Sequence, residues 1–340
     1  MMTARAPLKG LLPEELEALA VAEGARPFAG RQLAAWLYAR GAGGFEVMTD
    51  LPAALREKLG LRYRLSEASV ASSVRSVDGS VKLLVALADG ERVESVVIPE
   101  PKRTTLCLST QVGCARGCVF CATATMKLRR QLSAGEILDQ VVLARRLAPV
   151  TNVVFMGMGE PLDNYDNVRR AAILLSSPRG FGLAPRHVTI STVGVVPRIL
   201  DLARDRVPAR LTISLTAPDD ALRSELMPVN RRWPVRELMD AVAQWRDATG
   251  RDPTFAYVML KGVNDDPARA EALAALARPV HAKVNLIPYN PARAFDRPDE
   301  SVLERFRAVL ERRGVLSLVR RERGGDVAAA CGQLAVAAEA

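Results

Sequence analysis

Three cysteines lie close together between residues 113 and 121, with the spacing C-x3-C-x2-C. Cys114, Cys118 and Cys121 can turn three thiolates toward one point from a single short loop. Three thiolates are one too few for a closed tetrahedral zinc site or a fully ligated cubane iron–sulfur cluster. A [4Fe–4S] cluster held in this way keeps one iron free, and S-adenosylmethionine (SAM) can chelate that iron through its amino and carboxylate groups. Two alternatives stay open: a zinc site whose fourth ligand lies elsewhere, or a chance grouping of cysteines.

Small polar residues end several of the predicted strands, where a nucleoside-like ligand could be bound. The segment 157–161 (GMGEP) follows one strand, and its glycines let the backbone approach a ligand closely. Within this segment, the Glu160 carboxylate could hold an ammonium group such as that of SAM. Ser191, the segment 214–216 and Asn290 end three later strands. Each of these is more commonly an ordinary loop start, so only the succession of strand ends favours a ligand site.

Two further cysteines lie far from the triplet and from each other. Cys107 lies on a predicted strand, where a single cysteine is usually a small core residue. Cys331 lies in a loop of small residues after the basic segment 320–326, which is suited to reaching into a site. The chain has five cysteines, an odd number, and this argues against a structural disulfide framework.

Glu94 lies inside a predicted strand with apolar residues on both sides. A glutamate at an alternating strand position usually faces solvent. Glu94 could instead be a catalytic base, and the spacing alone leaves both interpretations open.

After residue 100 the chain alternates strand patterns with helix patterns. The strand-like runs cover residues 105–109, 152–156, 187–191, 211–215, 254–260, 283–288 and 315–320. Helical patterns such as 133–147 and 235–248 lie between most of them, and Ser133 with Glu136 forms a predicted capping box. Repeated units of this length predict a parallel sheet with right-handed crossovers. About six such units favour an α/β fold that is a partial, open (β/α)6 barrel rather than a closed eightfold one.

Residues 1–62 carry apolar side chains at helical spacing, which predicts a small helical unit. Its third helix is expected to start near Pro52, with Thr49 or Asp50 as the cap. A helical unit of this size more commonly docks a substrate than catalyses a reaction.

The rest of the chain divides into three parts. Residues 63–100 alternate with a period of two and contain Asp-Gly pairs, which predicts a β-hairpin extension. The barrel is expected over residues 101–325. A loop and tail that carry Cys331 are expected over residues 326–340.

Composition limits the class of protein and its partners. The chain has 340 residues, 49% of them apolar, and a formal net charge of +9. Its basic residues are mostly arginine, which suits phosphate contacts and base stacking, so the charge permits an RNA partner. The N-terminal residues lack the apolar run of a signal peptide, and no apolar run reaches the ~20 residues that span a bilayer. We therefore expect a soluble, cytoplasmic protein with no membrane partner.

Motifs along the whole chain resemble the RlmN and Cfr family of radical-SAM RNA methyltransferases. The motifs that carry the resemblance are CLSTQVGCARGCVFC, GMGEPL, STVGVVP, ISLTAP, YVMLKGVND, LIPYNP and DVAAACGQL. The helical N-terminal part resembles the family as well. Members of this family methylate an adenosine of large-subunit ribosomal RNA, and RlmN-type members also act on transfer RNA.

The resemblance implies a role for each matching residue. The implied ligands of one [4Fe–4S] cluster are Cys114, Cys118 and Cys121. The implied SAM-binding residues are Gly159, Glu160, Ser191, Ser214, Leu215, Thr216 and Asn290. Cys331 would become S-methylcysteine, Cys107 would be its resolving partner, and Glu94 would accept a proton.

The implied route gives both lone cysteines a use. Carbons C2 and C8 of adenine are electron-poor, so polar methyl transfer from SAM finds no nucleophile there. A first SAM would methylate Cys331, which a thiolate does readily. A second SAM would yield a deoxyadenosyl radical that takes a hydrogen from the S-methyl group. The methylene radical would add to the base, Glu94 would take the ring proton, and Cys107 would release the product through a transient disulfide.

The resemblance also implies two SAM molecules per turnover, an electron donor such as flavodoxin or ferredoxin, and a monomer. Two stretches depart from the family pattern. The usual Ser-Leu-His is Ser214-Leu215-Thr216, and residues 124–132 lack a glycine and an asparagine that usually follow the cluster cysteines. Both departures flank the expected SAM site and bear on the substrate rather than on the reaction type.

Three functions stay open on this basis. The first is methylation of adenosine carbon C2 in RNA. The second keeps the radical chemistry but directs it to C8 or to a non-RNA substrate. An N-terminal unit taken as basic would argue against the non-RNA substrate. The third is a non-catalytic iron–sulfur protein that binds RNA, and the presence of both Cys107 and Cys331 argues against it.

Overall fold

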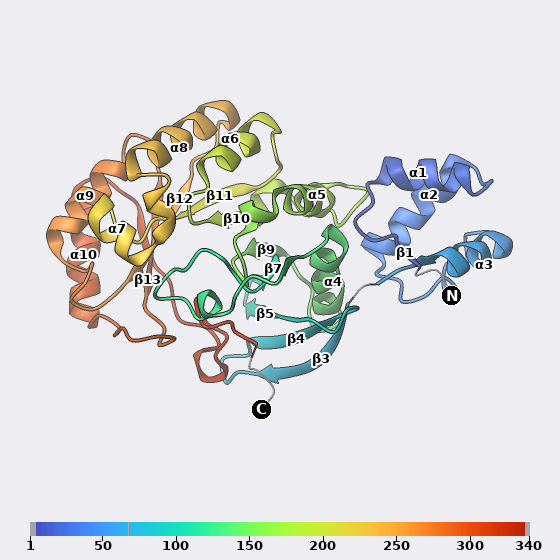
Figure 1. Cartoon of the computed structure of the whole chain (residues 1–340), viewed down its shortest axis with the longest axis horizontal. Coiled ribbons are helices and arrows are strands. Elements are labelled where there is room, and N and C mark those ends of the chain that lie inside the picture. The colour runs from blue at the N-terminus through green and yellow to red at the C-terminus, as the bar shows by residue number, and fades with distance from the viewer. Residues whose placement is uncertain (1–4, 67, 337–340) are drawn as a thin grey trace.

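The computed structural model describes residues 5–66 and 68–336, and its centre is one ten-stranded sheet (Figure 1). Seven of its strands are Arg103–Cys107 (β6), Asn152–Phe155 (β9), Val188–Thr192 (β10), Arg210–Ser214 (β11), Thr254–Met259 (β12), Lys283–Pro288 (β13) and Ser317–Val319 (β14). They pair in parallel in the order β14-β13-β12-β11-β10-β9-β6. The predicted strand-like runs are therefore confirmed as neighbours in one parallel sheet.

Helical crossovers join the parallel strands. The helices are Ala134–Arg145 (α4), Tyr165–Ser176 (α5), Val196–Arg204 (α6), Asp220–Leu226 (α7), Val235–Thr249 (α8), Pro267–Ala277 (α9) and Glu300–Arg312 (α10). Helices α6, α8, α9 and α10 lie along the outer side of the strands (Figure 1). The sheet ends at β14 without closing on itself, so the partial, open barrel is confirmed.

Helix α4 begins where its sequence predicts. The Ser133 hydroxyl accepts a hydrogen bond from the Glu136 N–H at 3.1 Å, and the Glu136 carboxylate accepts one from the Ser133 N–H at 2.8 Å. This capping box satisfies two backbone donors that a helix start leaves free. At the other end of the barrel, α8 stops at Gly250, whose φ of 67° is a left-handed value that glycine adopts without strain.

Three antiparallel strands extend the sheet beyond β6. They are Ala68–Arg75 (β3), Val81–Leu87 (β4) and Arg92–Glu100 (β5). Buried and half-buried residues alternate along β4, because only one face of this strand packs into the core. The predicted extension is confirmed, and it pairs β5 with β6 so that Val96 lies opposite Cys107.

The remaining strands and helical turns are short. The strands are Ala6–Pro7 (β1), Tyr63–Arg64 (β2), Gln111–Val112 (β7) and Arg130–Gln131 (β8), in two small sheets. The turns are Ala35–Ala39 (η1), Thr123–Thr125 (η2), Pro161–Asn164 (η3), Pro185–His187 (η4), Pro228–Arg231 (η5) and Gly325–Val327 (η6).

The N-terminal helices are Pro13–Ala22 (α1), Pro27–Ala34 (α2) and Ala53–Arg62 (α3). The predicted cap of the third helix is wrong, because Pro52 occupies the cap position. The Asp50 carboxylate instead accepts a hydrogen bond from Trp36 Nε1 at 2.5 Å. That contact ties the segment before α3 to η1 and takes the carboxylate away from the helix start.

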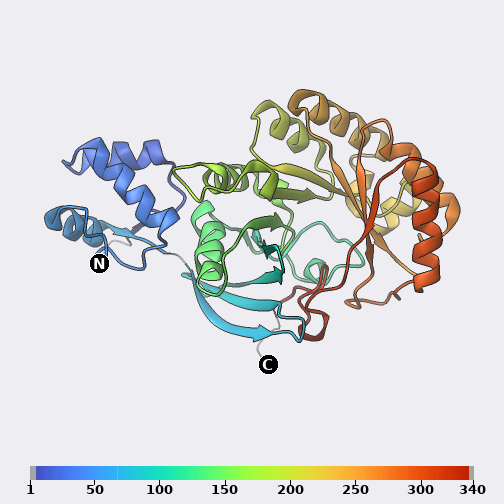
Figure 2. The same ribbon diagram turned by 180° about the vertical axis from the view of Figure 1, so that it is seen from behind.

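The helical unit packs beside α4 and α5 (Figure 2). Lys9 forms an ion pair with Asp139 of α4, and both side chains are buried. The rings of Tyr38 and Phe181 lie 5.6 Å apart. Arg170 of α5 also contacts the Glu15 carboxylate. Apolar and charged contacts therefore fix this unit against the barrel.

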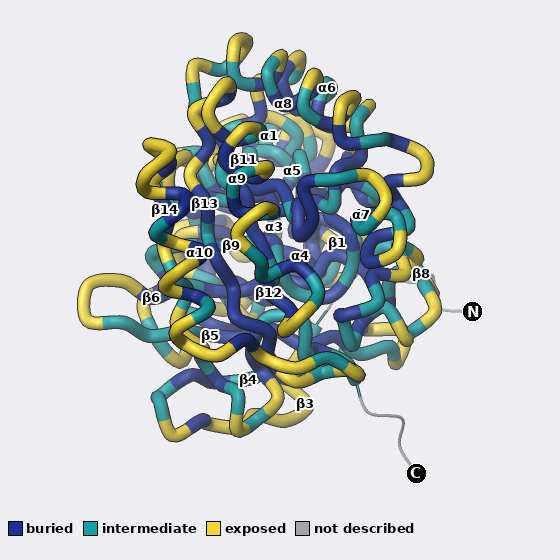
Figure 3. Tube along the Cα trace, turned by 90° about the vertical axis from the view of Figure 1, so that its left-hand side faces the viewer, coloured by how far each residue is buried: buried dark blue, intermediate teal, exposed yellow. Residues whose placement is uncertain are grey.

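The last described segment returns to the antiparallel extension. The Asp326 carboxylate accepts hydrogen bonds from the Ser76 hydroxyl at 2.5 Å and the Val77 N–H at 3.1 Å, both in the turn between β3 and β4. Figure 3 shows that buried residues follow the strands and the inner sides of the helices. Across the described residues, the search for a helix of membrane-spanning length and apolarity found none.

Candidate active site

The loop of residues 113–121, here called the cluster loop, is fixed to two distant segments by backbone hydrogen bonds. The Val119 N–H donates to the Leu226 carbonyl at the end of α7, at 3.1 Å. Directly after the cluster loop, the Ala122 N–H donates to the Gly332 carbonyl at 2.7 Å. The loop that carries Cys331 therefore lies directly against the end of the cluster loop.

Arg116 anchors the cluster loop from between two of its cysteines. Its Nε donates to Asp163 Oδ2 at 2.7 Å, and a terminal nitrogen contacts the other carboxylate oxygen. A bidentate pair of this kind fixes orientation as well as distance. Since Asp163 belongs to η3, directly after Glu160, the pair holds the cluster loop against the GMGEP segment.

The three cysteines of the cluster loop are near enough to influence one another. Burial raises the pKa of the Cys118 thiol, and the thiols of Cys121 and Cys114 raise it further. Burial also raises the pKa of Cys114 to about 11. Thiols whose pKa is raised in this way need a positively charged centre to become thiolates. Among the described residues, no three His, Cys, Asp or Glu side chains are placed to share a single metal ion.

A first cavity lies between the cluster loop and the ends of the parallel strands. Cys118 and Cys121 line it from the cluster loop. The strand ends contribute the predicted residues Gly159, Glu160, Ser191, Ser214 and Asn290. Parallel strands present their carboxyl ends at one edge of a sheet, which explains why residues so far apart in sequence meet here.

Glu160 is a buried carboxylate with hydrogen-bond donors but no ion-pair partner among the described residues. Its two oxygens accept hydrogen bonds from the Leu162 and Val193 N–H groups, both at 2.9 Å. Burial nevertheless raises its pKa to about 7. None of the ion pairs found among the described residues includes Glu160. A cationic ligand would supply the missing charge, and the ammonium group of SAM fits this need.

Gly159 shows why small residues are required at this position. Its φ is 97°, and a Cβ there would lie 2.5 Å from the Gln111 side chain. Gln111 in turn accepts a hydrogen bond from the Glu160 N–H at 2.7 Å. Glycine therefore allows Gln111 to fix the backbone that carries Glu160.

Two of the predicted SAM-binding residues do not line this cavity. The side chains of Leu215 and Thr216 are fully buried behind the strand end. The Leu215 carbonyl accepts a hydrogen bond from Arg223 Nε at 3.1 Å, and the Thr216 carbonyl accepts one from Asn264 at 2.7 Å. Thr216 has a φ of 58°, which is strained for a β-branched residue. Their placement suits a role in shaping the end of β11.

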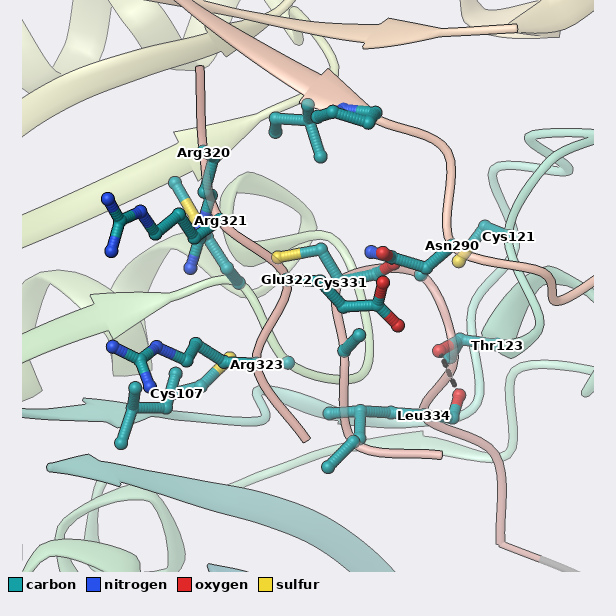
Figure 4. Close-up of a pocket in the computed structure, with 18 residues that line it drawn as sticks. Cys107, Cys121, Thr123, Asn290, Arg320, Arg321, Glu322, Arg323, Cys331 and Leu334 are labelled. Atoms are coloured by element: carbon teal, nitrogen blue, oxygen red, sulfur yellow. Dashed lines mark hydrogen bonds between the residues drawn. The ribbon is translucent and has the colours of Figure 1, made fainter. Parts of the chain in front are cut away.

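A second cavity contains both lone cysteines. Cys107 and Cys331 line it together with Arg320, and Figure 4 shows the two sulfur atoms at this cavity. Burial raises the pKa of Cys107 to about 12, with a further contribution from Cys331. All five cysteines are free thiols in this structure.

The two cavities share a wall, and Asn290 and Cys331 belong to both. Asn290 Nδ2 donates to the Cys331 carbonyl at 3.1 Å. Its side-chain oxygen is buried and has no hydrogen-bond donor among the described residues. An unsatisfied buried acceptor costs free energy, so a donor on a ligand in either cavity would stabilise this site.

Glu94 does not face solvent, so the solvent-exposed interpretation of this strand residue is wrong. Its side chain is 7% exposed and lies 3.1 Å from Lys82 Nζ. The other carboxylate oxygen accepts a hydrogen bond from the Ala335 N–H at 3.0 Å. Ala335 directly follows Leu334, and Leu334 lines the second cavity. Glu94 therefore lies beside that cavity and behind its C-terminal wall.

Comparison with known proteins identifies the family. The N-terminal domain of ribosomal RNA large subunit methyltransferases matches residues 7–64, and the radical SAM superfamily matches residues 108–273. A dual-specificity RNA methyltransferase RlmN from Anaeromyxobacter dehalogenans is 49% identical over 96% of this chain and 91% of its own. This chain belongs to the RlmN family.

Other RlmN relatives agree with this assignment. A probable dual-specificity RNA methyltransferase RlmN from Thermus thermophilus is 47% identical over 97% of this chain and 93% of its own. The crystal structure of a radical SAM methyltransferase from Sphaerobacter thermophilus matches with a TM-score of 0.92 and 44% identity, over 97% of this chain and 99% of its own. The radical-SAM fold is thus established over nearly the whole chain.

Three residues of this RlmN-family site were not predicted from the sequence. Arg320 lines the cavity of the two cysteines, and its guanidinium lies 3.6 Å from Met156 Sδ. Lys82 pairs with Glu94 from the neighbouring strand. Arg223 is fully buried and donates to backbone carbonyls at the ends of β10 and β11. The sequence signals were the basic segment 320–326, which contains Arg320, and a single lysine within the apolar run 80–87.

Proposed function

We propose that this protein methylates carbon C2 of an adenosine in RNA, by radical SAM chemistry and through a methylated Cys331. The observation that carries the proposal is the cavity that Cys107 and Cys331 share, next to the cavity of Glu160 and the cluster loop. Binding of RNA alone would use neither cysteine. The printed names of the RlmN relatives support RNA as the substrate.

Residues of both cavities would hold the cofactors. The three thiols of the cluster loop fit one [4Fe–4S] cluster, because Cys118 is buried beside Cys121 and Cys114 and a cluster would supply the positive charge that a thiolate needs there. The Glu160 carboxylate and the free Asn290 oxygen fit the donors of SAM. When bound, cluster and SAM supply a methyl group for Cys331 and the radical that activates it, with two SAM molecules used per turnover.

Each lone cysteine then has a separate task. Cys331 accepts the methyl group at its sulfur, which lies at the wall common to the two cavities. Burial disfavours the thiolate of Cys107 by raising its pKa, so this residue is suited to act after Cys331 rather than as the methyl acceptor. Attack of the Cys107 sulfur on the Cys331 sulfur would form a transient disulfide, break the sulfur–methylene bond and leave its electron pair on the methylated base, and a thiol reductant would then restore both cysteines. Glu94 would accept the proton that leaves the adenine ring.

The helical unit over residues 1–62 would dock the RNA, though not by charge. It contains eight Lys and Arg residues against seven Asp and Glu, so the expectation of a basic unit is wrong. The excess positive charge lies in the remaining part of the chain. RNA contacts of this unit would therefore depend on shape and on stacking. The protein would act as a monomer with a small electron-transfer protein such as flavodoxin or ferredoxin as its reductant.

The test is a methylation assay under anaerobic conditions. Purified protein should contain about four irons and four sulfides per chain, in line with three cysteine ligands and one open iron. With SAM and a reductant it should convert RNA adenosine to 2-methyladenosine, measured by mass spectrometry of the digested nucleosides. Formation of 8-methyladenosine would move the target to C8. Bound RNA without any methylation would favour the non-catalytic alternative, and a colourless zinc protein would exclude the radical route.

A further inference from the structure

Both oxygens of the Glu94 carboxylate are occupied, each by a different part of the chain. One lies 3.1 Å from the Lys82 ammonium on β4. The other accepts a hydrogen bond from the Ala335 N–H in the C-terminal segment, at 3.0 Å. The strand register pairs Glu94 with Leu84, so Lys82 reaches it along the same face of the extension. The carboxylate is thus held between a strand and the segment that follows Cys331.

Lys82 also contacts the loop that carries Cys331. Its ammonium lies 3.4 Å from the Ala328 carbonyl, in addition to its pairing with Glu94. The Lys82 side chain is 18% exposed, so its pairing with the buried Glu94 is largely shielded from water, whereas its contact with the exposed Ala328 lies at the surface. One side chain therefore links the residue assigned as the proton acceptor to the loop of the methyl acceptor.

The contacts of Glu94 with Lys82 and with the Ala335 N–H shift its pKa in the direction opposite to burial. Burial raises the pKa of Glu94, because the charged form loses hydration. Lys82 lowers it, both by its charge and by its hydrogen bond, and the Ala335 N–H lowers it as well. Of the charged side chains in the described residues, Lys82 alone has a resolved effect on this carboxylate. Burial is already the largest of these influences, so removing Lys82 would raise the pKa of Glu94 further.

We propose that Lys82 is a positioning residue for the proton-transfer step: it keeps Glu94 ionised inside the protein and aligned with the Cys331 loop. This inference rests on the proposed function, in which Glu94 accepts the ring proton. In that step the carbon–hydrogen bond at the target carbon breaks, the proton goes to a carboxylate oxygen, and the electron pair stays with the ring. A neutral Glu94 could not accept it, and a carboxylate held elsewhere could not reach it.

Deuterium loss from the target carbon isolates this step. Large-subunit ribosomal RNA fragments carrying deuterium at adenosine C2 would be incubated with holoenzyme, SAM and reductant over a range of pH. The variants are Lys82→Met, which removes the charge, and Lys82→Arg, which keeps it. Lys102→Met is the matched control, because Lys102 is exposed on the same extension.

On the acid side of its pH–rate profile, here called the acid limb, the wild type should lose deuterium at a rate that falls about tenfold for each unit by which the pH is lowered. This slope is expected for one titrating base. In Lys82→Met the acid limb should move to higher pH, with the rate approaching that of the wild type at alkaline pH. Lys82→Arg should return the limb toward its original position, and Lys102→Met should leave it unchanged. Iron content and methylation of Cys331 should be equal in all four proteins.

An acid limb that is the same in Lys82→Met and the wild type would overturn the role of Lys82. If Lys82→Met is recovered unfolded, Lys82→Gln replaces it, because glutamine keeps a donor for the Ala328 carbonyl and lacks the charge. Absence of methylation in the wild type at every pH would overturn the proposed function instead. Full deuterium loss in Glu94→Gln would show that another group takes the proton, and would remove the basis for Lys82 as well.

Discussion

At the scale of single residues, the site contains buried polar groups that lack an ion-pair partner or a hydrogen-bond donor within the protein. Glu160 has two N–H donors but no cation, and the Asn290 oxygen has no donor among the described residues. Such groups destabilise the empty protein and bind a ligand that complements them. Ligand affinity at this site is therefore linked to a stability cost in the free protein.

Glu160 allows this link to be measured. Its pKa is about 7 in the folded protein against an ordinary value of 4.5, so its contribution to the free energy of unfolding is greatest below about pH 4.5 and is lost as pH rises through 7. The difference corresponds to about 3 kcal/mol. Relative to the wild type, Glu160→Gln should gain stability by that order as pH rises from 4.5 to above 7, measured by denaturant unfolding without SAM. SAM binding by the same variant should fall sharply.

Parallel stability profiles for the two proteins would contradict a buried, unpaired carboxylate. Glu304→Gln serves as the control, since Glu304 is exposed on α10. Its stability should follow the wild type across the same pH range.

The two lone cysteines should give different products when each is replaced. Cys331→Ala should lose RNA methylation and carry no methyl group on the protein, because the methyl acceptor is gone. Cys107→Ala should still be methylated on Cys331 and should then stall as a covalent adduct with RNA. Denaturing gels should show a nuclease-sensitive band of lower mobility for Cys107→Ala alone. Continued methylation by Cys331→Ala, with no adduct in either variant, would exclude the S-methylcysteine route.

Residue identity was predictable where a motif fixes chemistry, and less so where the surroundings decide it. The sequence predicted Glu94 as either an exposed strand residue or a base, and burial by the C-terminal segment decides against exposure. It could not indicate Lys82, because a lone cation in a strand has no periodic signal, and it indicated Arg320 only as part of the basic segment 320–326. Leu215 and Thr216 were implied by resemblance, and only the fold shows that their side chains turn away from the cavity.

At the scale of elements, the β3–β4 turn supports the loop that carries Cys331. Besides the contacts of Asp326 with this turn, the Gly324 N–H donates to Asp78 Oδ2 at 2.9 Å. Asp78 also accepts a hydrogen bond from the Ser80 N–H at 2.8 Å, which keeps the turn in shape. The antiparallel extension therefore positions the methyl acceptor as well as Glu94.

Replacing Asp78 should release that loop. Asp78→Ala should make trypsin cleave after Arg321 and Arg323 faster by roughly tenfold, the order expected from losing one hydrogen bond to a charged group. RNA methylation should fall while iron content stays constant, because the cluster loop is not touched. Asp252→Ala is the control, since Asp252 is an exposed residue paired with Arg246 on the other side of the barrel. Equal cleavage of both variants would show that the turn does not hold the loop.

The elements themselves followed closely from the sequence. Period-two and period-3.6 patterns predicted the strands and helices of the barrel, and the capping box marked the start of α4. The cap of α3 was mispredicted because the Asp50 carboxylate has a tertiary partner, Trp36 Nε1, that local sequence does not reveal. Which loops pair across the site, such as the β3–β4 turn with residues 324–326, is a tertiary feature with no signature in either segment.

At the scale of the whole molecule, the charge of +9 predicts how RNA affinity depends on salt. If phosphate contacts dominate, the logarithm of the affinity should fall linearly with the logarithm of the salt concentration, by roughly 0.7 to 0.9 per contact. The measurement is a filter-binding or fluorescence titration with a ribosomal RNA fragment at several salt concentrations. A slope near zero would mean that phosphate contacts contribute little and that RNA is held by other means.

The nearly neutral helical unit should contribute to RNA affinity through contacts that salt does not screen. Phe28 is 57% exposed on α2, and the Arg31 guanidinium lies 5.4 Å from its ring centre. Exposed aromatic rings and arginine planes stack on unpaired bases. A Phe28→Ala and Arg31→Ala double variant should bind RNA more weakly by about 1–3 kcal/mol and lower the salt slope by no more than one contact. Leu61→Ala is the control, because this side chain is 75% exposed on α3. An equal loss of RNA affinity in the double variant and in the control would contradict base stacking by Phe28 and Arg31.

The return of the C-terminal segment to the site also orders events during biosynthesis. Residues 324–336 pair with parts of the chain made long before them: Leu334 with Thr123 at 2.6 Å, and Ala335 with Glu94 at 3.0 Å. Because the ribosome releases a chain from its N-terminus, the barrel can fold while this segment is still absent. Until it emerges, Cys121 lacks the wall that Cys331 and Gly332 add to the cavities it lines. The active site is therefore completed only after the last residues of the chain have been made.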